Sequence, residues 1–307
     1  DIDLGTASLK YKSFFAGLTD SENFKINGGQ GDDGQVLTST GSGVAWEDAS
    51  GGATDINGLS DAKTFGTSSI MLGDATTGTI DAANYNVGLG IDVFAALTSG
   101  DNNTAVGFAA GDANTTGSNN TFMGTNAGGA NIAQQWNVAV GTSALAAEAT
   151  SGSNTAVGGL ALATSNGGSN NTAIGKQALT SLTTADHNTA VGSNALFNIT
   201  TGYGNVAVGY LAAYSLEGGS GDGKNNVAIG REALEGQVTQ EDNIAIGYLA
   251  LHVGNSTSNS QNTVVGSQAG TAAHAGYGNC YFGYAAGAAN TSGIHNCNYG
   301  RAAGSVI

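Results

Sequence analysis

Side chains that could carry out acid–base chemistry are few in this chain and lie far apart in the sequence. The four histidines show neither the His-x-His nor the His-Glu-x-x-His spacing that would suggest a metal site: His187, His252, His274 and His295. The densest acidic group is Glu232, Glu235, Glu241 and Asp242. Paired carboxylates held side by side could hydrolyse a glycan, but solvated turn residues account better for this group. We therefore expect no catalytic residues, no metal ion and no cofactor, and a protein that is not an enzyme.

Two further groups near the C-terminal end could contact other molecules or one another. Cys280 and Cys297 would lie on adjacent coils if the chain repeats with the interval that separates them. They could then form a disulfide, although two small apolar packing residues are the simpler interpretation. Four tyrosines are candidate receptor contacts and could equally cap the end of a repeat array: Tyr277, Tyr281, Tyr284 and Tyr299.

The composition limits what the chain can bind. Its 307 residues carry 23 Asp and Glu but only 8 Lys and Arg, a formal net charge of −15, so nucleic acids and anionic membranes would be repelled. No stretch approaches the ~20 apolar residues of a membrane span. The two cysteines give neither a disulfide framework nor a zinc pattern. We therefore expect neither nucleic-acid binding nor membrane insertion.

A short motif dominates the sequence from about residue 69 onward. It is "NTAVG" at 103–107, 154–158 and 188–192, and close variants such as "NVAVG" and "NIAIG" stand between and after these copies. The asparagine that opens the motif recurs at a constant interval of 17 along the chain, except for one interval of 21 and one of 19: Asn103, Asn120, Asn137, Asn154, Asn171, Asn188, Asn205, Asn226, Asn243, Asn262, Asn279 and Asn296. A period held this closely indicates a repeat architecture in which each repeat is one structural unit.

Each repeat is predicted to form one coil of a parallel β-solenoid, so the fold class is all-β. A unit of this length is too short for the helix pair of a helical repeat, and its Gly, Val and Thr favour strands. Counting from the asparagine, the fourth residue is Gly and the seventh is Ala in all twelve copies. We expect a strand before the glycine, a tight turn at it, and a second short strand that carries an Ala-Leu pair. About fourteen coils from Ser69 onward would stack into a rod roughly 65 Å long, with a ladder of hydrogen-bonded asparagines.

The alternation within the motif suggests which side chains face the interior of the coil. The first and third residues after the asparagine are mostly Thr, Val or Ile, and we expect them to face inward. The second residue is Ala in eight of the twelve copies, and such an apolar row on the outside would indicate packing against another copy of the chain. The alternative is a flattened monomeric coil with both rows inside. Inward threonines, together with the interruption at Val138, also argue against an ice-binding threonine array.

Residues 1–52 do not repeat and are predicted to form a small β-rich module that connects the rod to whatever precedes it. Three stretches favour short strands separated by Gly and Asp turns: "SLKYKSFFAGL", "NFKINGG" and "QVLTSTGSGVAWED". Residues 53–68 are expected to be a linker that leads into the solenoid of residues 69–307. The segments 215–225 and 252–261, which hold the extra residues of the two longer repeats, are expected to form bulged turns.

The motif resembles those of known fibrous proteins. "NTAVG", "NVAIG" and "NIAIG", followed by x-x-Ala-Leu, resemble the head repeats of YadA-like trimeric autotransporter adhesins. The 17-residue form with "TTGSNNT" turns is more similar still to repeats of bacteriophage tail-fibre proteins. Two stretches before the repeats also resemble segments of phage fibres: "GDDGQVLTSTGSGVAWED" (31–48) and "DINGLSDAKTFGTSSIMLGD" (55–74). The resemblance implies a left-handed β-roll assembled as a homotrimer, and the handedness rests on it alone.

The resemblance also implies a function, namely the shaft of a phage tail fibre in the virion, serving attachment to the host cell surface. Its implied partners are further copies of the chain, an upstream fibre or baseplate protein, and a glycan or protein receptor on the host. The alternative is the head of a trimeric autotransporter adhesin on the bacterial cell surface, and a glycan depolymerase is a third, weaker interpretation. The sequence shows neither the Ser/Lys self-cleaving chaperone of many such fibres nor the stalk and anchor barrel of autotransporters, and the second difference favours the phage interpretation.

Overall fold

The computed structural model describes residues 35–39, 44–48, 62–65, 69–72, 82–216, 223–236, 241–252, 260–272 and 276–304. The chain divides into two compact units, Asp1–Gly58 and Leu59–Ile307. In the first unit, β1 (Gln35–Ser39) pairs antiparallel with β2 (Val44–Asp48). This pair coincides with the third stretch expected to form strands in residues 1–52, and the other two stretches lie outside the described residues.

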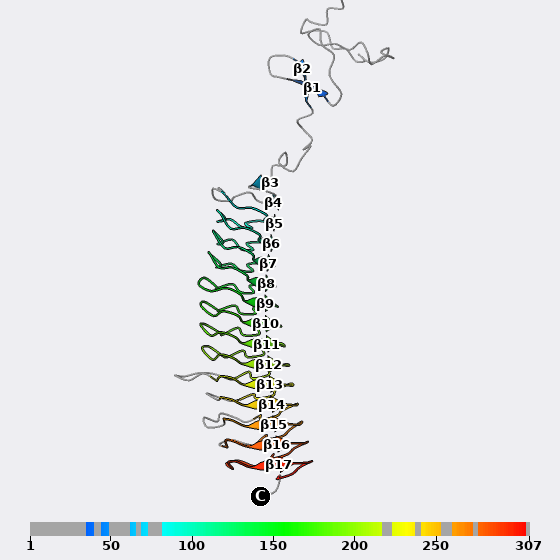
Figure 1. Ribbon diagram of the computed structural model, residues 1–307. Coiled ribbons are helices and arrows are strands. Elements are labelled where there is room, and N and C mark those ends of the chain that lie inside the picture. The colour runs from blue at the N-terminus through cyan, green and yellow to red at the C-terminus, as the bar shows by residue number, and fades with distance from the viewer. Residues whose placement is uncertain are drawn as a thin grey trace, which may run out of the picture. The chain divides into compact units, whose positions relative to one another are not determined.

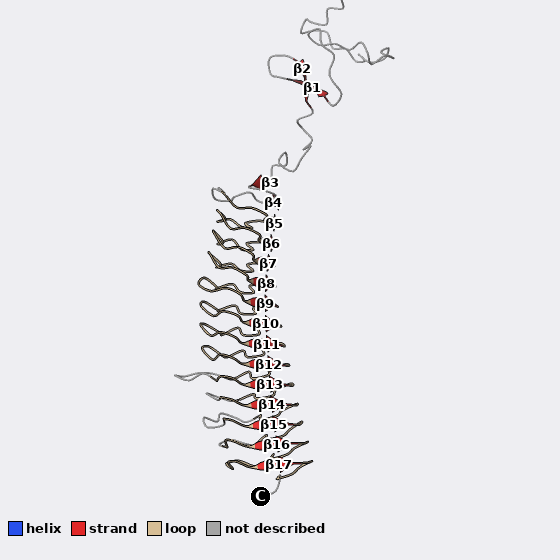
Figure 2. Ribbon diagram, in the orientation of Figure 1, coloured by secondary structure: helices blue, strands red, loops and turns tan. Residues whose placement is uncertain are grey.

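The described strands of the second unit form one sheet and are stacked in one column (Figure 1). β3 (Ala62–Phe65) runs antiparallel to β4 (Ser69–Leu72), and all strands from β4 to β17 run parallel. Each later strand has three residues: β5 (Val87–Leu89), β6 (Thr104–Val106), β7 (Thr121–Met123), β8 (Val138–Val140), β9 (Thr155–Val157), β10 (Thr172–Ile174), β11 (Thr189–Val191), β12 (Val206–Val208), β13 (Val227–Ile229), β14 (Ile244–Ile246), β15 (Thr263–Val265), β16 (Cys280–Phe282) and β17 (Cys297–Tyr299). Turns complete each coil, and the described ranges contain no helix (Figure 2). The predicted all-β fold class and parallel β-solenoid are confirmed.

Neighbouring strands pair in register, so that each residue lies beside the same motif position of the next coil. Ala173 of β10, for example, lies opposite Ala156 of β9 and Ala190 of β11. The register survives the longest repeat, because Ala207 of β12 lies opposite Ala228 of β13. The extra residues of the longer repeats therefore leave the sheet intact, although the middle parts of these segments, 217–222 and 253–259, lie outside the described residues.

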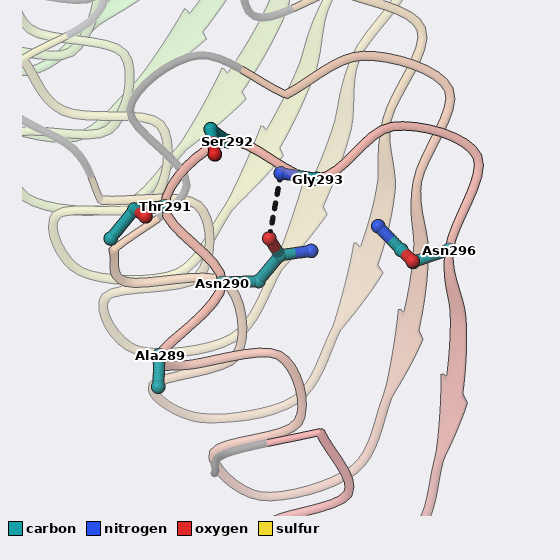
Figure 3. A pocket seen from close by; sticks show the side chains of 6 residues that line it. All are labelled: Ala289, Asn290, Thr291, Ser292, Gly293 and Asn296. Carbon is teal, nitrogen blue, oxygen red and sulfur yellow. Dashed lines mark hydrogen bonds between the residues drawn. The ribbon is translucent and has the colours of Figure 1, made fainter. Parts of the chain in front are cut away.

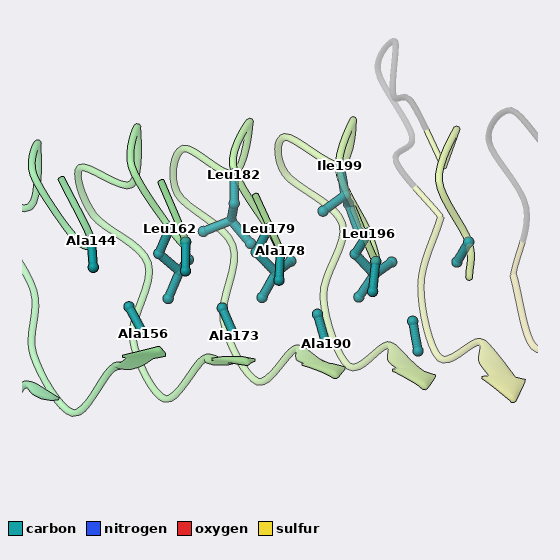
Figure 4. Close-up of a cluster of buried hydrophobic side chains, with 14 of the residues drawn as sticks. Ala144, Ala156, Leu162, Ala173, Ala178, Leu179, Leu182, Ala190, Leu196 and Ile199 are labelled. Carbon is teal, nitrogen blue, oxygen red and sulfur yellow. The ribbon is translucent and has the colours of Figure 1, made fainter. Parts of the chain in front are cut away.

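The inward face of the strands is the opposite of the one we expected. In β10 the middle residue, Ala173, is completely buried, whereas Thr172 is half-buried and Ile174 is exposed. The prediction that Thr and Val face inward and Ala outward is therefore wrong. Figure 4 shows the reason: leucines such as Leu162 and Leu179 extend into the coil from the opposite wall, which leaves room on the strand for little more than a methyl group.

Exceptions to the alanine row support this explanation. Phe122 replaces the alanine in β7 and is completely buried. Where other coils have the opposing leucine, the coil of Phe122 has Gly128 and the preceding coil has Gly111. A Cβ atom at Gly111 would lie 2.6 Å from the Phe122 ring. Tyr281 replaces the alanine in β16, and a Cβ atom at Gly287 would lie 2.7 Å from its ring. A large side chain on the strand is thus accompanied by a glycine on the opposite wall, so the volume that fills the coil stays similar.

The wall opposite the sheet is not the second strand that the sequence suggested. Two consecutive residues of this wall, such as Ala178 and Leu179, are both completely buried. Successive residues of a strand face opposite sides, so a strand could not bury both. The chain instead visits left-handed φ at alternate residues, 58° at Gln177 and 52° at Leu179. Coils still bond to one another here: the N–H of Leu162 donates to Ala178 O at 3.0 Å.

The invariant glycine ends each strand for two physical reasons. Gly175, which follows β10, has a φ of 135°, where side-chain-bearing residues are strained. A Cβ atom on Gly175 would also lie 2.5 Å from the carbonyl oxygen of Gly192, the equivalent glycine of the next coil. A positive φ and a close backbone approach therefore coincide at the turn that we expected after the strand.

Candidate functional site

A ladder of asparagines holds successive coils together. The backbone N–H of Asn171 donates to Asn154 Oδ1 at 2.9 Å, and the N–H of Asn188 donates to Asn171 Oδ1 at 2.9 Å. The Nδ2 of Asn171 donates to Ala185 O, in the turn of the same coil, at 2.8 Å. One side-chain amide therefore closes its own coil and binds the next one.

The ladder is buried and begins earlier than the twelve asparagines of the motif. The ladder residues from Asn103 to Asn279 are at most 2% exposed. Asn103 donates its backbone N–H to Asn86 Oδ1 at 2.8 Å, and Asn86 donates its own to Ser69 Oγ at 2.9 Å. Sequence reasoning did not include Asn86 and Ser69 in the ladder, although they stand one and two periods before Asn103.

A second file of buried polar residues lies inside the rod, each one period of the repeat from the next: Asn114, Asn131, Glu148 and Ser165. Glu148 is a completely buried carboxylate. It accepts hydrogen bonds from the N–H and Oγ of Ser151, both at 2.9 Å, and from Ser165 Oγ in the next coil at 2.8 Å. Because these donors satisfy the carboxylate, Glu148 stabilises its turn and is not available to a substrate.

The acidic group singled out in the sequence is divided among separate contacts. Three of its carboxylates each have a basic neighbour: Arg231 Nε at 2.8 Å from Glu232, His252 Nδ1 at 3.5 Å from Glu235, and Lys224 Nζ at 3.1 Å from Glu241. Asp242 accepts a hydrogen bond from Asn225 Nδ2 at 3.2 Å. Burial raises the pKa of Glu235, against the influence of His252. These residues are arranged as individual polar contacts along the surface.

The histidines do not gather either. His187 and His295 are exposed in the turns before the ladder asparagines, His252 is half-buried, and His274 lies outside the described residues. Within the described part of the chain, no group of three or more His, Cys, Asp or Glu residues could hold a metal ion. A search of the same residues for a helix long and apolar enough to cross a membrane found none.

A cavity of about 290 Å³ lies in the turn of the last coils (Figure 3). Its lining is Ala289, Asn290, Thr291, Ser292, Gly293 and Asn296. Asn290 points across the turn, and its Oδ1 accepts a hydrogen bond from the Gly293 N–H at 2.8 Å. None of the six lining residues titrates, so the cavity has no acid or base for catalysis.

The candidate receptor tyrosines divide into an exposed and a buried set. Tyr277, Tyr284 and Tyr299 are exposed. Tyr281 is completely buried, its hydroxyl accepts a hydrogen bond from Asn290 Nδ2, and burial raises its pKa. The expectation that Tyr281 contacts a receptor is therefore wrong. It occupies the middle position of its strand, which faces inward, and the error follows from the reversed faces of the strand.

Cys280 and Cys297 lie opposite each other on adjacent strands, as their spacing predicted. Both are free thiols; Cys280 is half-buried and Cys297 is exposed. They stand at the first position of their strands, which faces outward, so they do not pack inside the coil. Cys280 Sγ lies 4.0 Å from the hydroxyl of Tyr299.

The first and third residues of β5 to β17 form a continuous surface that we call the outer strand face. It contains no charged residue: Val, Thr, Ile, Leu and Met make up most of it, and the last two coils contribute Cys280, Phe282, Cys297 and Tyr299. Its threonines do face solvent, contrary to expectation, but Val138, Val206, Val227 and Ile244 interrupt their row. The outer strand face is therefore an apolar strip and not a threonine array.

Comparison with known proteins identified no relatives of this chain. A scan against protein-family models, a search of curated proteins and a search of solved structures each found no match. The chain's function must therefore be argued from its own residues and geometry.

Proposed function

We propose that the chain is a structural protein without enzymatic activity, the shaft of a phage tail fibre that serves attachment of the virion to the host cell surface. The observation that carries this proposal is the rod itself. Its coils are in register, and their buried side chains form a hydrogen-bonded ladder and a narrow apolar core. The repeated residues supply length and stiffness. The likeness of the motif to fibre repeats supports the same function.

The outer strand face supports association of the shaft as a homotrimer. The alanine row that first suggested association is buried, but the outer face is apolar on a chain with a net charge of −15. Twelve coil spacings by a three-residue strand give a strip of about 58 Å by about 10 Å, or roughly 600 Å² per copy. Two such strips in contact bury about 1,200 Å², near the lower limit for a specific interface. Monomers rarely expose apolar strips of this size.

The trimer can be tested by light scattering on the full chain. We expect a particle of three times the chain mass of 30.1 kDa. The double variant Val157→Asp and Val191→Asp places charges on the outer strand face and should yield monomers. Thr142→Asp is the matched control, since Thr142 is exposed but follows the invariant glycine and lies outside that face. A monomeric wild-type chain would refute the trimer.

The phage and bacterial alternatives differ in where the protein is found. The proposal expects an upstream fibre or baseplate protein and a host glycan or protein receptor as partners. Antibodies against the purified chain should label the tail fibres of virus particles in electron micrographs. Label on the envelope of uninfected bacteria would instead support an adhesin of the autotransporter type.

The depolymerase alternative predicts that purified protein releases reducing ends from a host polysaccharide. We expect no release. Release that disappears in a Glu232→Gln or Glu235→Gln variant would overturn the non-enzymatic proposal, because those two carboxylates belong to the densest acidic group.

A further inference from the structure

One row of side chains along the rod differs from all others in charge. It consists of the residues that directly follow the invariant glycines, and we call it the post-glycine row: Ile91, Phe108, Thr125, Thr142, Gly159, Lys176, Ser193, Tyr210, Arg231, Tyr248, Ser267, Tyr284 and Arg301. Residues 69–307 contain four Lys or Arg, and three of them stand in this row, whereas none of the 13 acidic residues does. Cations are thus concentrated in one of seventeen positions on an acidic chain.

The C-terminal half of the row is an exposed ridge of tyrosine and arginine. Tyr210, Tyr248 and Tyr284 are 49%, 40% and 50% exposed. The guanidinium of Arg231 lies over the ring of Tyr248, 5.5 Å from its centroid, and that of Arg301 lies 5.7 Å from the centroid of Tyr284. Each of these contacts joins the side chains of two adjacent coils, so the ridge contains two arginine–tyrosine pairs.

The ridge has a period of two coils. The tyrosines follow β12, β14 and β16, with Arg231, Ser267 and Arg301 on the coils between and after them. Since neighbouring strands are about 4.8 Å apart, the tyrosines recur every ~10 Å. This distance is close to the length of two pyranose units in an extended polysaccharide chain.

We propose that this ridge binds a linear acidic polysaccharide that carries one carboxylate per two sugar units and lies parallel to the rod. Tyrosine offers an apolar ring face and a hydroxyl to a sugar, and arginine donates paired hydrogen bonds to a carboxylate. Arg231 follows β13 and Arg301 follows β17, four coil spacings or about 19 Å apart, so they would meet every second carboxylate of such a chain. A dense polyanion such as a nucleic acid would be repelled by the net charge of −15.

The two arginines are expected to contribute unequally. Arg231 bonds Glu232 through its Nε at 2.8 Å, and this neighbouring carboxylate partly neutralises the positive charge that an anionic ligand would meet there. Arg301 has no ion pair with any carboxylate among the described residues. Binding should therefore depend more on Arg301 than on Arg231.

The inference rests on the proposed function, because it names the class of receptor that the fibre would bind. The test uses the full chain and titration calorimetry with hyaluronan oligosaccharides, which have one carboxylate per disaccharide. The probes for comparison are uncharged chito-oligosaccharides and an oligothymidylate. Of the three probes, we expect only hyaluronan to bind. Its affinity should fall at least tenfold in Arg301→Gln and further when Tyr248→Ala is added.

Lys224→Gln is the matched control, since Lys224 is the one cation of residues 69–307 outside the row and also lies over a tyrosine ring, that of Tyr203 at 5.9 Å. It should leave hyaluronan binding within twofold of wild type. Equal loss in Lys224→Gln, equal binding of the uncharged probe, preference for oligothymidylate, or no hyaluronan binding would each overturn the proposal. Fibre labelling on virus particles would be unaffected by any of these results, so the two proposals can fail separately.

Discussion

At the scale of single residues, the ladder position is asparagine in every coil after that of Ser69 because of what its amide does. Asn171 accepts the N–H of the next coil with its oxygen and donates to its own turn with its nitrogen. Aspartate lacks the donor, serine has a single short hydroxyl, and glutamine is one methylene longer. The invariance of the residue within the repeat thus has a chemical cause.

Asn171→Ala should lower the free energy of unfolding by about 1–3 kcal/mol, because it leaves the buried N–H of Asn188 without its acceptor. Urea unfolding followed by circular dichroism would measure the loss. Asn166→Ala is the control, since Asn166 is exposed and outside the ladder. An equal effect of the two substitutions would contradict the role of the ladder.

Gly175→Ala should destabilise the protein by at least about 1–3 kcal/mol, because it combines a strained φ of 135° with a clash against the next coil. Gly159→Ala provides a comparison one coil away, where a Cβ atom would meet nothing closer than 3.9 Å. That change should be neutral or slightly stabilising. Thermal unfolding of both variants measures the difference, and similar midpoint temperatures for Gly175→Ala and Gly159→Ala would refute the argument.

At the scale of the coil, the sequence predicted the period, the strand, the glycine turn and the position of the asparagines. It did not reveal which face of the strand is inside. A period of two distinguishes two faces but does not say which one is buried, and we placed the larger residues, such as Val157, inside. The relevant evidence was available in the pairing of Phe122 with Gly128: a residue that needs space opposite it must point inward.

The same limit explains the other errors at this scale. Tyr281 was included among the candidate receptor contacts because the tyrosines gather near the C-terminal end, and the wrong inner face gave no reason to leave it out. The wall around Ala178 and Leu179 was expected to be a strand because the sequence does not reveal a left-handed φ at leucine, which propensities disfavour. Hydrogen bonds to the coils on either side, from the Gln177 N–H to Gly159 O and from the Leu179 N–H to Ala195 O, help to hold that conformation, and they form only when coils are stacked.

The exchange of volume between the walls can be tested by a double-mutant cycle. Gly128→Leu alone should cost about 1–3 kcal/mol by overpacking against Phe122, and Phe122→Ala alone about 3–5 kcal/mol by leaving a cavity. Together the two substitutions recreate the common Ala and Leu pair. The double variant should therefore lose at least about 0.5 kcal/mol less free energy of unfolding than the sum of the two single losses, which is a coupling typical of contacting residues. Chemical denaturation of the four proteins gives the coupling, and simple additivity would exclude contact between the walls.

At the scale of the whole molecule, stability is expected to accumulate coil by coil, since each coil contacts only its neighbours. Deleting residues 172–188 removes one period and joins Asn171 directly to Thr189, restoring the motif. The shortened chain should fold with an unchanged circular dichroism spectrum per residue. Deleting only 172–179 leaves a repeat too short to close, and should cause a large loss of thermal stability. Comparable behaviour of the two deletions would contradict a coil-by-coil assembly.

The direction of the hydrogen bonds between coils has a mechanical consequence. They run from coil to coil, and a pull on the two ends of the stack therefore strains one boundary at a time. A coil that detaches occupies about 4.8 Å of the rod but frees a peptide that can extend to roughly 55–60 Å. Under tension the rod would lengthen in discrete steps and dissipate work at each one, so that it behaves as a stiff strut at rest and as an extensible tether under load.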